Sequence, residues 1–376
     1  MRRLALGFPF GRQRRQGRLS ARTPVLALLP PWRILPPDPL QIGTRMVESL
    51  PAAVPTRAAS RSATTSKHAL ETFGLTDVGL VRDGNEDALL LLESEKLYVV
   101  ADGMGGHSAG EVASAFTIEA LRSFYGNPDL TKRVKSAYLR AKRAKSEMTA
   151  AEASPHALRL RKAVESANIS VYRLAQQHEQ LRDMGTTLVG AAFHRNFIHI
   201  ANVGDSRMYR LRSGKLRQMT EDHSLLNEYI RMNLLQPEEI ESFPYKNVIV
   251  RALGLQEQVV VDLFVDRVRR GDQYLLCSDG LTDLVRDEEI ELVLRNAPSA
   301  QSACYRLTEL AKARGGHDNI TTVIVRVHSS KWEPPRPAAP PPPPAGAMGG
   351  PPSMPPPSGA APVVIPPPPP GRAPVD

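Results

Sequence analysis

The stretch from residue 86 to residue 106 reads EDALLLLESEKLYVVADGMGG. Two short apolar runs, at 88–92 and 97–101, flank a polar segment, which is the pattern of a β-hairpin. Asp102 comes directly after the second run, and a glycine-rich segment that allows close approach of the backbone to a ligand follows it. The stretch therefore predicts a buried hairpin that ends in a carboxylate.

Two more pairs of strand-like runs follow the same pattern. Runs at 187–193 and 197–203 form one pair, and runs at 207–211 and 216–219 form the other. A short polar turn joins the two runs of each pair, as in a hairpin. A series of adjacent hairpins predicts sheets that are largely antiparallel.

Helical spacing of apolar residues appears in three other segments. The residues that carry it are Val112, Phe116, Ala120 and Phe124; Val164, Ala167, Val171 and Leu174; and Ala303, Leu307, Leu310 and Ala311. Helices in this order among antiparallel hairpins predict one α+β domain over residues 66–330, in which the helices cover the sheets.

The two ends of the chain differ in composition from this domain. Residues 1–65 form a basic arm rich in arginine and proline, whose first 45 residues hold nine arginines and one acid. Residues 331–376 form a proline-rich tail that holds 20 of the chain's 34 prolines. Both compositions predict disorder. The arm is either a solvated tail or a contact for an anionic partner, and Met46 is an alternative start of the chain.

Membrane insertion and secretion are not expected. The apolar run at 25–29 is too short to span a bilayer, and it ends in two prolines without a convincing cleavage pattern. The two cysteines, Cys277 and Cys304, suit a reducing compartment, and neither begins a C-x5-R loop. We therefore expect a cytoplasmic protein and exclude a cysteine-dependent phosphatase.

Six acidic residues stand where strand-like runs begin or end. Three follow a run and three precede one. They are Asp102, Asp205 and Asp279, and Glu86, Asp87 and Asp318. In antiparallel pairing, the end of one strand and the start of the next lie at the same edge of the sheet. The six carboxylates are therefore expected to converge.

Carboxylates gathered in one cleft repel each other unless cations neutralise them. Because the ligands are oxygens and no Cys/His cluster has ligand spacing, the site suits Mg²⁺ or Mn²⁺. Two such ions would lower the pKa of a shared water and stabilise charge on a transferring phosphoryl oxygen. The pattern predicts hydrolysis without a protein nucleophile.

Two neighbouring features have both a functional and an ordinary interpretation. Arg82 lies four residues before Glu86, where its guanidinium could hold phosphate oxygens in a bidentate manner, or it is an exposed loop arginine without a role. The segment at 103–106 lacks the Gly-Lys-Ser/Thr of a P-loop, and a simple turn is the alternative to a metal-binding backbone.

Six short motifs run through the domain in order. They are RDGNED at 82–87, DGMGGH at 102–107, MGTT at 184–187, VGDSR at 203–207, CSDGLTD at 277–283 and GHDNIT at 316–321. Together they resemble the bacterial form of the PPM (PP2C-like) family of metal-dependent serine/threonine protein phosphatases. The resemblance covers roughly two thirds of the chain, from about residue 72 to residue 327.

The resemblance implies a fold and an activity. The fold would be a four-layer α-β-β-α sandwich of two antiparallel sheets flanked by helices, with two Mn²⁺ or Mg²⁺ ions in a cleft at one end. The activity would be hydrolysis of phosphoserine and phosphothreonine monoesters by a metal-activated water. Phosphorylated proteins would be the substrates, and Ser/Thr kinases would supply them.

The resemblance also implies roles for single residues. Asp102 would bridge both ions, and Arg82 would hold the substrate phosphate. The direct metal ligands would be Asp102, the Gly103 carbonyl, Asp279 and Asp318, with Glu86 and Asp87 acting through metal-bound waters. A third, weaker ion would take Asp205, Asp279 and Asp283, the last of which is otherwise an ordinary surface acid.

The chain also departs from the family pattern. Eukaryotic relatives have a histidine, proposed as a general acid, where this chain has Met104, and His107 is a candidate substitute. Residues 223–250 resemble a mobile flap associated with substrate choice, and an ordinary surface helix and loop are the alternative.

Other functions remain open beside the phosphatase. The fold could serve as a non-catalytic binding module, which the intact acids argue against. It could be another two-metal hydrolase such as a phosphodiesterase or nuclease, which the lack of a basic groove outside the arm argues against. The basic stretch at 131–145 fits a solvated helix face, so we expect no nucleic-acid partner. We expect a monomer, and the tail could dock on a protein partner.

Overall fold

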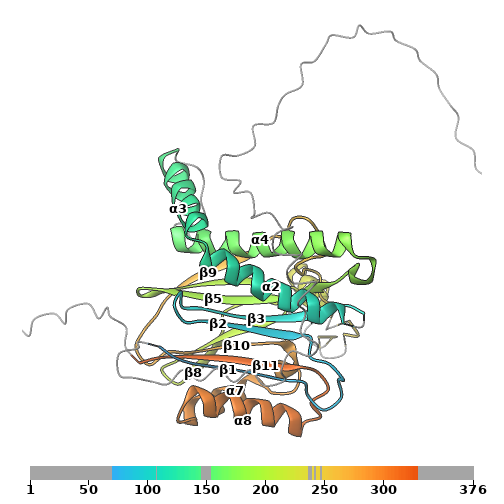
Figure 1. Cartoon of the computed structure of the whole chain (residues 1–376). Coiled ribbons are helices and arrows are strands. Elements are labelled where there is room, and N and C mark those ends of the chain that lie inside the picture. Colours follow the sequence, from blue (N-terminus) through green and yellow to red (C-terminus); the bar gives the residue numbers. More distant parts are fainter. Residues whose placement is uncertain are drawn as a thin grey trace, which may run out of the picture. The chain divides into compact units, whose positions relative to one another are not determined.

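Two antiparallel sheets packed face to face form the centre of the structure (Figure 1). The computed structural model describes residues 70–328, except 107, 145–153, 236–238, 241–242 and 246–247. The predictions for the arm at 1–65 and the tail at 331–376 lie outside the described residues.

The first sheet has five strands in the order β1-β11-β10-β7-β8, and every neighbouring pair is antiparallel. Its strands are β1 (Leu70–Asp77), β7 (Arg207–Arg212), β8 (Lys215–Gln218), β10 (Gln273–Cys277) and β11 (Ile320–Val327). In β11 all residues but Arg326 are buried, because helices cover one face and the second sheet covers the other.

The second sheet has the order β2-β3-β5-β6-β9, with the short strand β4 paired to the end of β3. Its strands are β2 (Asp87–Leu92), β3 (Leu97–Met104), β4 (Gly185–Thr186), β5 (Leu188–His194), β6 (Phe197–Val203) and β9 (Asp262–Arg267). The pairs β2/β3, β5/β6 and β7/β8 are the three hairpins expected from the sequence, and the structure confirms them.

Helices form the two outer layers. The helices α2 (Ala109–Gly126) and α4 (Pro155–Gln177) cover the second sheet, and α7 (Asp287–Asn296) and α8 (Ala300–Ala313) cover the first (Figure 1). Shorter or more peripheral elements are α3 (Pro128–Arg143), the 3₁₀ helix η2 (Glu179–Leu181), α5 (Leu225–Arg231) and α6 (Asp279–Thr282).

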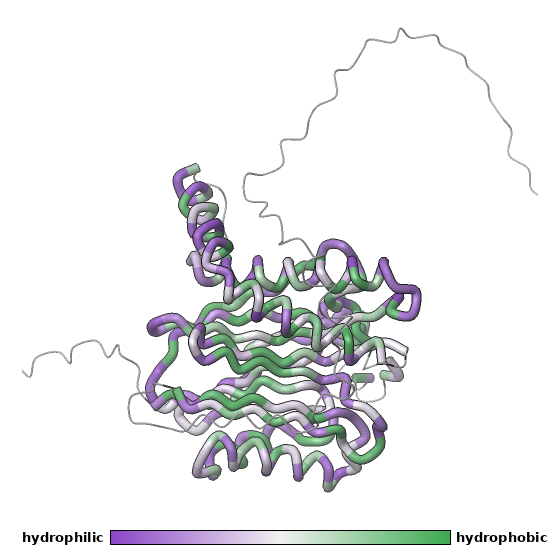
Figure 2. Tube along the Cα trace, viewed as in Figure 1, coloured by the Kyte–Doolittle hydropathy of each residue, from purple (hydrophilic) through white to green (hydrophobic). Residues whose placement is uncertain are grey.

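Apolar side chains fill three layers between these elements. One layer lies between the two sheets, one between the second sheet and α2 and α4, and one between the first sheet and α7 and α8. Figure 2 shows the same pattern as hydrophobic strands at the centre and mixed colours on the helices. The expected four-layer α-β-β-α sandwich is therefore confirmed.

Two elements are not evident from sequence patterning. The strand β9 is an edge strand that pairs with β6 alone, and its residues are half-buried or exposed. The helix α7 begins with three consecutive acids and buries only Ile290 and Leu294. Both segments are short, with six and ten residues, and so carry little periodic signal. Within the described residues, no helix is both long enough and apolar enough to cross a membrane.

Candidate active site

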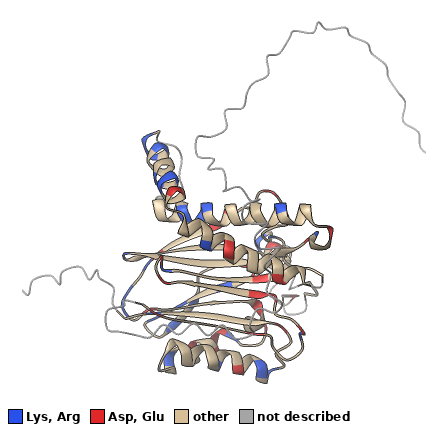
Figure 3. Cartoon of the chain, in the orientation of Figure 1, with Lys and Arg blue, Asp and Glu red and all other residues tan. Residues whose placement is uncertain are grey.

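The ends of several strands of both sheets meet at one edge of the sandwich, and acidic residues gather there (Figure 3). Asp87 begins β2 and Asp102 lies near the end of β3, and the two are direct partners in the antiparallel ladder. The main chain of Asp102 is held by two threonines. Its N–H donates to Thr187 Oγ1 at 3.0 Å, and its carbonyl accepts from Thr186 Oγ1 at 2.8 Å.

Ser278 connects the first sheet to this pair. Its hydroxyl donates to Asp87 Oδ2 at 2.8 Å and accepts from the Thr321 N–H at 3.0 Å. Ser278 follows β10, and the next residue, Asp279, begins α6. One hydroxyl therefore fixes the strand ends of two sheets relative to each other.

Asn319 fixes the loop that carries Arg82 and Glu86. Its side-chain amide donates to the carbonyls of Val78 and Gly84 at 3.0 and 2.9 Å, and its Oδ1 accepts from the Glu86 N–H at 2.8 Å. All bonding positions of this side chain except one lone pair are thus used on one loop. The result is that Glu86, Asp87 and Asp318 lie in the same cluster.

Burial and mutual repulsion disfavour the charged forms of these carboxyls. Burial, followed by the charges of Asp87, Asp279 and Asp205, raises the pKa of Asp102 well above its ordinary value. Burial raises the pKa of Asp87 to about 8, although hydrogen bonds from Thr321 and Ser278 partly oppose this. Such shifts mark a group of acids without a compensating cation.

The same holds for the acids nearer the first sheet. Burial, with the charge of Asp279, raises the pKa of Asp205 to about 8. Burial, with the charges of Asp283 and Asp318, raises the pKa of Asp279 to about 6. The pKa of Glu86 is raised by burial and lowered by Arg82, with a net rise. The six carboxylates expected to converge do lie close enough to act on each other.

Two oxygens of the cluster, Asp87 Oδ1 and Asp205 Oδ1, are buried and find no hydrogen-bond partner among the described residues. Leaving a buried polar group without a partner costs about 1–3 kcal/mol, and more for a charged one. A bound cation would supply the missing partner. The residue types fit this interpretation, because carboxylate and carbonyl oxygens are the ligands of Mg²⁺ and Mn²⁺.

Two glycines leave room for the cluster. A Cβ on Gly103 would come within 2.1 Å of the Gly110 carbonyl oxygen, and a Cβ on Gly110 would come within 2.6 Å of the Glu86 carboxylate. Both positions therefore require glycine for β3 and the start of α2 to approach this closely. The Gly103 carbonyl belongs to the same crowded strand end.

The carboxylates of the cluster act on one another and on Arg82. Asp279 raises the pKa of Asp102, and Asp318 Oδ2 accepts from Arg82 Nη2 at 2.9 Å. Within the described part of the chain, no three His, Cys, Asp or Glu side chains are disposed to hold a metal ion as they lie. The chemistry of the donor set, carboxylate and carbonyl oxygens, fits divalent cations.

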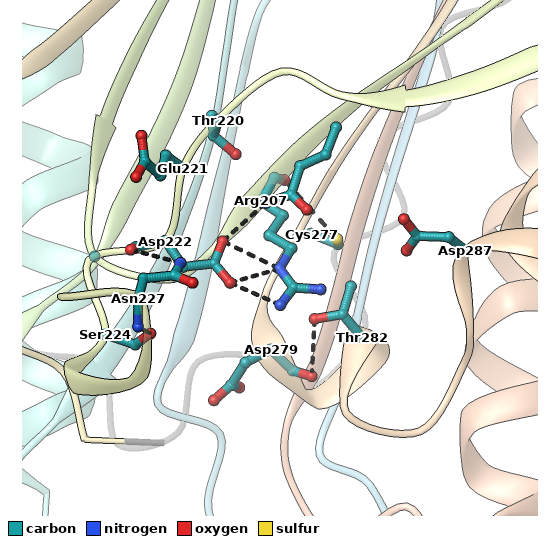
Figure 4. A network of polar contacts seen from close by, with 12 residues as sticks. Arg207, Thr220, Glu221, Asp222, Ser224, Asn227, Cys277, Asp279, Thr282 and Asp287 are labelled. Carbon is teal, nitrogen blue, oxygen red and sulfur yellow. Dashed lines mark hydrogen bonds and ion pairs between the residues drawn. The ribbon is translucent and has the colours of Figure 1, made fainter. Parts of the chain in front are cut away.

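A cavity of about 170 Å³ opens beside the cluster. Three of the predicted acids, Asp205, Asp279 and Asp283, line it together with Arg207 and Asp222. Figure 4 shows Arg207, Asp222 and Asp279 side by side. The structure therefore brings the expected third set of acids to one cavity. Asp283 also follows α6 directly, where its N–H donates to the Asp279 carbonyl at 2.8 Å.

Sequence reasoning missed the ion pair that borders this cavity. Arg207 donates from Nε and Nη2 to the Asp222 carboxylate, with a shortest distance of 2.6 Å (Figure 4). The Asp222 carbonyl in turn accepts from the side chain of Asn227 on α5 at 2.9 Å. Arg207 thus connects β7 to the base of the predicted flap. The only signal in the sequence is its position two residues after Asp205.

The predicted flap and general acid are described only in part. Ser224 caps α5 by accepting from the Asn227 N–H at 3.3 Å, and it forms an isolated bridge with Ile249. Met104 is the last residue of β3 and pairs with Gly185. His107 lies outside the described residues, so its proposed acid role stays a prediction.

The amino-acid sequence of the chain is similar to those of known protein phosphatases. Residues 81–321 match the family model described as Protein phosphatase 2C. The serine/threonine phosphatase Stp of Listeria welshimeri is 38% identical over 253 residues, which are 66% of this chain and 93% of that protein. The serine/threonine protein phosphatase PstP of Mycobacterium tuberculosis is 38% identical over 67% of this chain and 44% of its own length.

Solved structures agree with the sequence comparison. The catalytic domain of PstP, in complex with two manganese ions, superposes with a TM-score of 0.56 at 35% identity. The match covers 69% of this chain and 99% of that domain. The match to the family model includes neither the arm nor the tail.

Proposed function

Because the chain belongs to the protein phosphatase 2C family, we propose that it removes phosphate from phosphoserine and phosphothreonine side chains of proteins. The observation that carries the proposal is the buried carboxylate cluster with two unpartnered oxygens at the shared edge of both sheets. A scaffold that only binds proteins has no use for such a cluster, because its acids repel each other.

Metal binding is assigned to the acids that the motifs single out. Two divalent cations, Mn²⁺ or Mg²⁺, would be held at the cluster, and a third, weaker cation would be held at the 170 Å³ cavity. The residues that would hold the pair are Asp102, the Gly103 carbonyl, Asp279 and Asp318, with Glu86 and Asp87 acting through water, and those for the third are Asp205, Asp279 and Asp283. When bound, the cations supply a water of lowered pKa and stabilise charge on the phosphoryl oxygens.

The residues of the chain bind and orient the substrate. Arg82 is half exposed at the edge of the cluster, where its guanidinium can hold two phosphate oxygens. Ser278 and Asn319 hold the carboxylates and the Arg82 loop in register. Met104 has no proton to give to the leaving group, which leaves that task to His107 or to solvent.

The same proposal extends to the substrates, the compartment and the domain organisation of the enzyme. Ser/Thr kinases supply its phosphoprotein substrates, and the cytoplasm is the compartment where both meet. The folded phosphatase domain comprises residues 66–330, acts as a monomer, and is flanked by the arm at 1–65 and the tail at 331–376. The tail is a candidate dock for a protein partner because proline-rich segments are recognised in extended form.

The test is phosphate release by the purified full chain. With p-nitrophenyl phosphate and a phosphothreonine peptide, we expect turnover in Mn²⁺ or Mg²⁺ and none in EDTA. Asp279→Asn should abolish turnover, because it removes a charged ligand shared by two of the proposed cation sites. Asp129→Asn, on exposed α3, is the matched control and should leave turnover unchanged.

No release with any metal, from a chain that unfolds cooperatively, would reject the proposal in favour of a binding module. Release that persists in EDTA would reject the metal mechanism. Cleavage of a phosphodiester at a rate comparable to the monoester would favour a different two-metal hydrolase.

A further inference from the structure

A second cavity, of about 430 Å³, lies at the other end of the first sheet from the carboxylate cluster. The strand β7 leads from Arg207, beside the cluster, to Arg212, in the wall of this cavity. At a rise of about 3.3 Å per residue, the two ends of the strand are roughly 16 Å apart. Its lining includes Arg212, Arg269, Arg270, Asp272 and Arg295.

The floor of this cavity is rigid and electrically balanced. Asp272 is 1% exposed, and its carboxylate accepts from Nε and Nη2 of Arg212, both at 2.8 Å. The Tyr274 hydroxyl and the Arg269 N–H complete the set at 3.1 and 2.6 Å. Four donors satisfy one carboxylate, so Arg212 and Asp272 contribute structure rather than a free charge.

The rim carries positive charge that is not balanced in this way. Arg269 and Arg270 are exposed and form no ion pair with any other described residue. Arg295 has a weak partner, Glu291 at 3.5 Å, with half of its side chain in solvent. Three guanidinium groups therefore surround one opening, and the only acid in the lining is already saturated by its own donors.

Two tight turns keep the opening in shape. Gly271 has φ 87°, and its N–H donates to the Val327 carbonyl at 2.9 Å, which pins the loop of Arg269 and Arg270 to β11. In the β7–β8 turn, Gly214 has φ 76°, and a Cβ there would meet the Arg295 guanidinium at 3.8 Å. The arginines are thus presented by fixed backbone, which lowers the entropy lost when they bind a ligand.

We propose that this cavity is a second anion site that binds a phosphate group, separate from catalysis. Planar guanidinium forks match phosphate oxygens in a bidentate manner, and several around one concavity favour a ligand with more than one negative charge. The volume falls in the range of small-ligand sites, so the phosphate can be free or belong to a larger molecule such as a phosphorylated side chain. The site does not depend on the proposed phosphatase activity, because it shares no residue with the carboxylate cluster.

The experiment is calorimetric titration of the full chain in EDTA, which keeps the proposed cation sites out of the measurement. The probes are inorganic phosphate, a phosphothreonine peptide and the same peptide without phosphate. The variants are Arg269→Glu with Arg270→Glu, and Arg295→Ala as a milder change. Arg140→Glu with Arg143→Glu on α3 is the control with the same change in net charge.

We expect at least one phosphate-bearing probe to bind, and the unphosphorylated peptide not to. Binding should weaken about tenfold or more in both cavity variants, because charge-assisted hydrogen bonds are lost, and stay within about twofold in the α3 control. Binding of phosphate alone would identify a free-anion site, and binding of the phosphopeptide alone would identify a contact for protein substrates.

Three results would overturn the proposal. One is that no phosphate probe binds, and another is that the α3 control weakens binding as much as the cavity variants do. The third is that Arg82→Ala abolishes binding while the cavity variants retain it, since the probe would then occupy the carboxylate end. Arg269 and Arg270 are exposed, so their variants should fold, and their melting temperatures check this.

Discussion

The two ends of the β-sandwich each bury an aspartate, and the surroundings of the two aspartates differ. Asp272, at the arginine end, is surrounded by four donors and paired with Arg212. Asp102, at the carboxylate end, is buried among other acids, which raise its pKa, and its hydrogen-bond neighbour is another carboxyl group. The same fold thus holds one buried acid that its surroundings satisfy and one that they do not.

This difference separates structural burial from functional burial. Where an aspartate serves the fold, donors from several elements accompany it, because an unpaired buried charge is costly. Where donors are replaced by more acids, the fold carries a deficit that an external cation can remove. This contrast supports the proposed metal site on grounds that do not depend on any motif.

The substitution Asp102→Asn should have the largest effect, and it tests whether the acid at the carboxylate end serves catalysis. Catalytic cations contribute several kcal/mol to the transition state, so kcat/KM for p-nitrophenyl phosphate in Mn²⁺ should fall by about 10³-fold or more. In EDTA the same substitution should raise the melting temperature, because it removes a group whose charged form is disfavoured by burial and by the neighbouring acids. A lower melting temperature in EDTA would show that the carboxylate already has a stabilising partner.

Asp272→Ala tests the opposite end, and its effect should be on stability. It leaves the Arg212 guanidinium without its main partner, which should lower the free energy of unfolding by about 3–5 kcal/mol in urea denaturation. Turnover by the folded fraction should be unchanged. Replacing both partners, by Arg212→Met with Asp272→Leu, should recover most of the loss. If the single variant is as stable as the wild type, the paired aspartate is not structural.

Arg207→Met addresses the link between the two ends, because Arg207 begins β7 and holds Asp222 at the base of the flap. Groups that orient metal ligands or their neighbours typically contribute 10–100-fold, and we expect a loss of about that size in kcat/KM for a phosphoprotein. The substitution should raise KM more for the phosphoprotein than for p-nitrophenyl phosphate, because the predicted flap is associated with substrate choice.

Arg210→Met is the matched control for this variant, because Arg210 lies on the same strand and pairs with Asp266 instead. It should lower stability without changing the ratio of the two KM values. Equal losses for both substrates in Arg207→Met would mean that the residue supports the fold and does not position the flap.

The smallest expected effect is on the pH dependence of stability, and it concerns three neighbouring histidines. His156 lies on α4, His194 ends β5 and His199 lies on β6. His156 stacks on His194 with ring centroids 3.4 Å apart, and burial lowers the pKa of His156 and of His199 to about 4. The unfolded chain binds these protons near pH 6.5, so the native state loses stability as pH falls from about 6.5 to about 4.

Melting temperatures between pH 7 and pH 4 measure this loss. His199→Phe should flatten the decline, because the replaced ring no longer takes up a proton in the unfolded chain. His178→Phe, outside the stacked group, is the control and should leave the slope as it is in the wild type. If the melting temperature of His199→Phe falls with pH as steeply as that of the wild type, carboxyl groups alone cause the loss of stability in acid.

The sequence allows the carboxylate end to be predicted better than the rest of the molecule. Antiparallel hairpins have one regular consequence, the return of strand ends to a common edge, so the convergence of Asp102 and Asp279 could be inferred from where the runs stop. The contact between Arg207 and Asp222 could not, because it depends on the path of an irregular loop. The hydrogen bonds from Asn319 to the loop at 78–86 could not be predicted either, because they depend on the path of that loop.

The arginine end shows the limit of such inference more plainly. Arg212 ends β7, Arg270 lies in a turn and Arg295 lies on α7, and no periodic pattern predicts that these three segments will meet. Pairing of Asp272 with Arg212 across neighbouring strands is a matter of register and side-chain reach. Local patterns predict strands and helices, whereas contacts between distant turns need the folded chain.

The bond between Arg82 and Asp318 has a consequence for the order of binding events. If Asp318 is a cation ligand and Arg82 binds the phosphate, the bond between them competes with the binding of both ligands. Occupancy of one position releases the other, so cation and phosphate ester would each raise the affinity for the other by the same factor. Because the ion pair is partly exposed, this coupling would be about 1 kcal/mol or less.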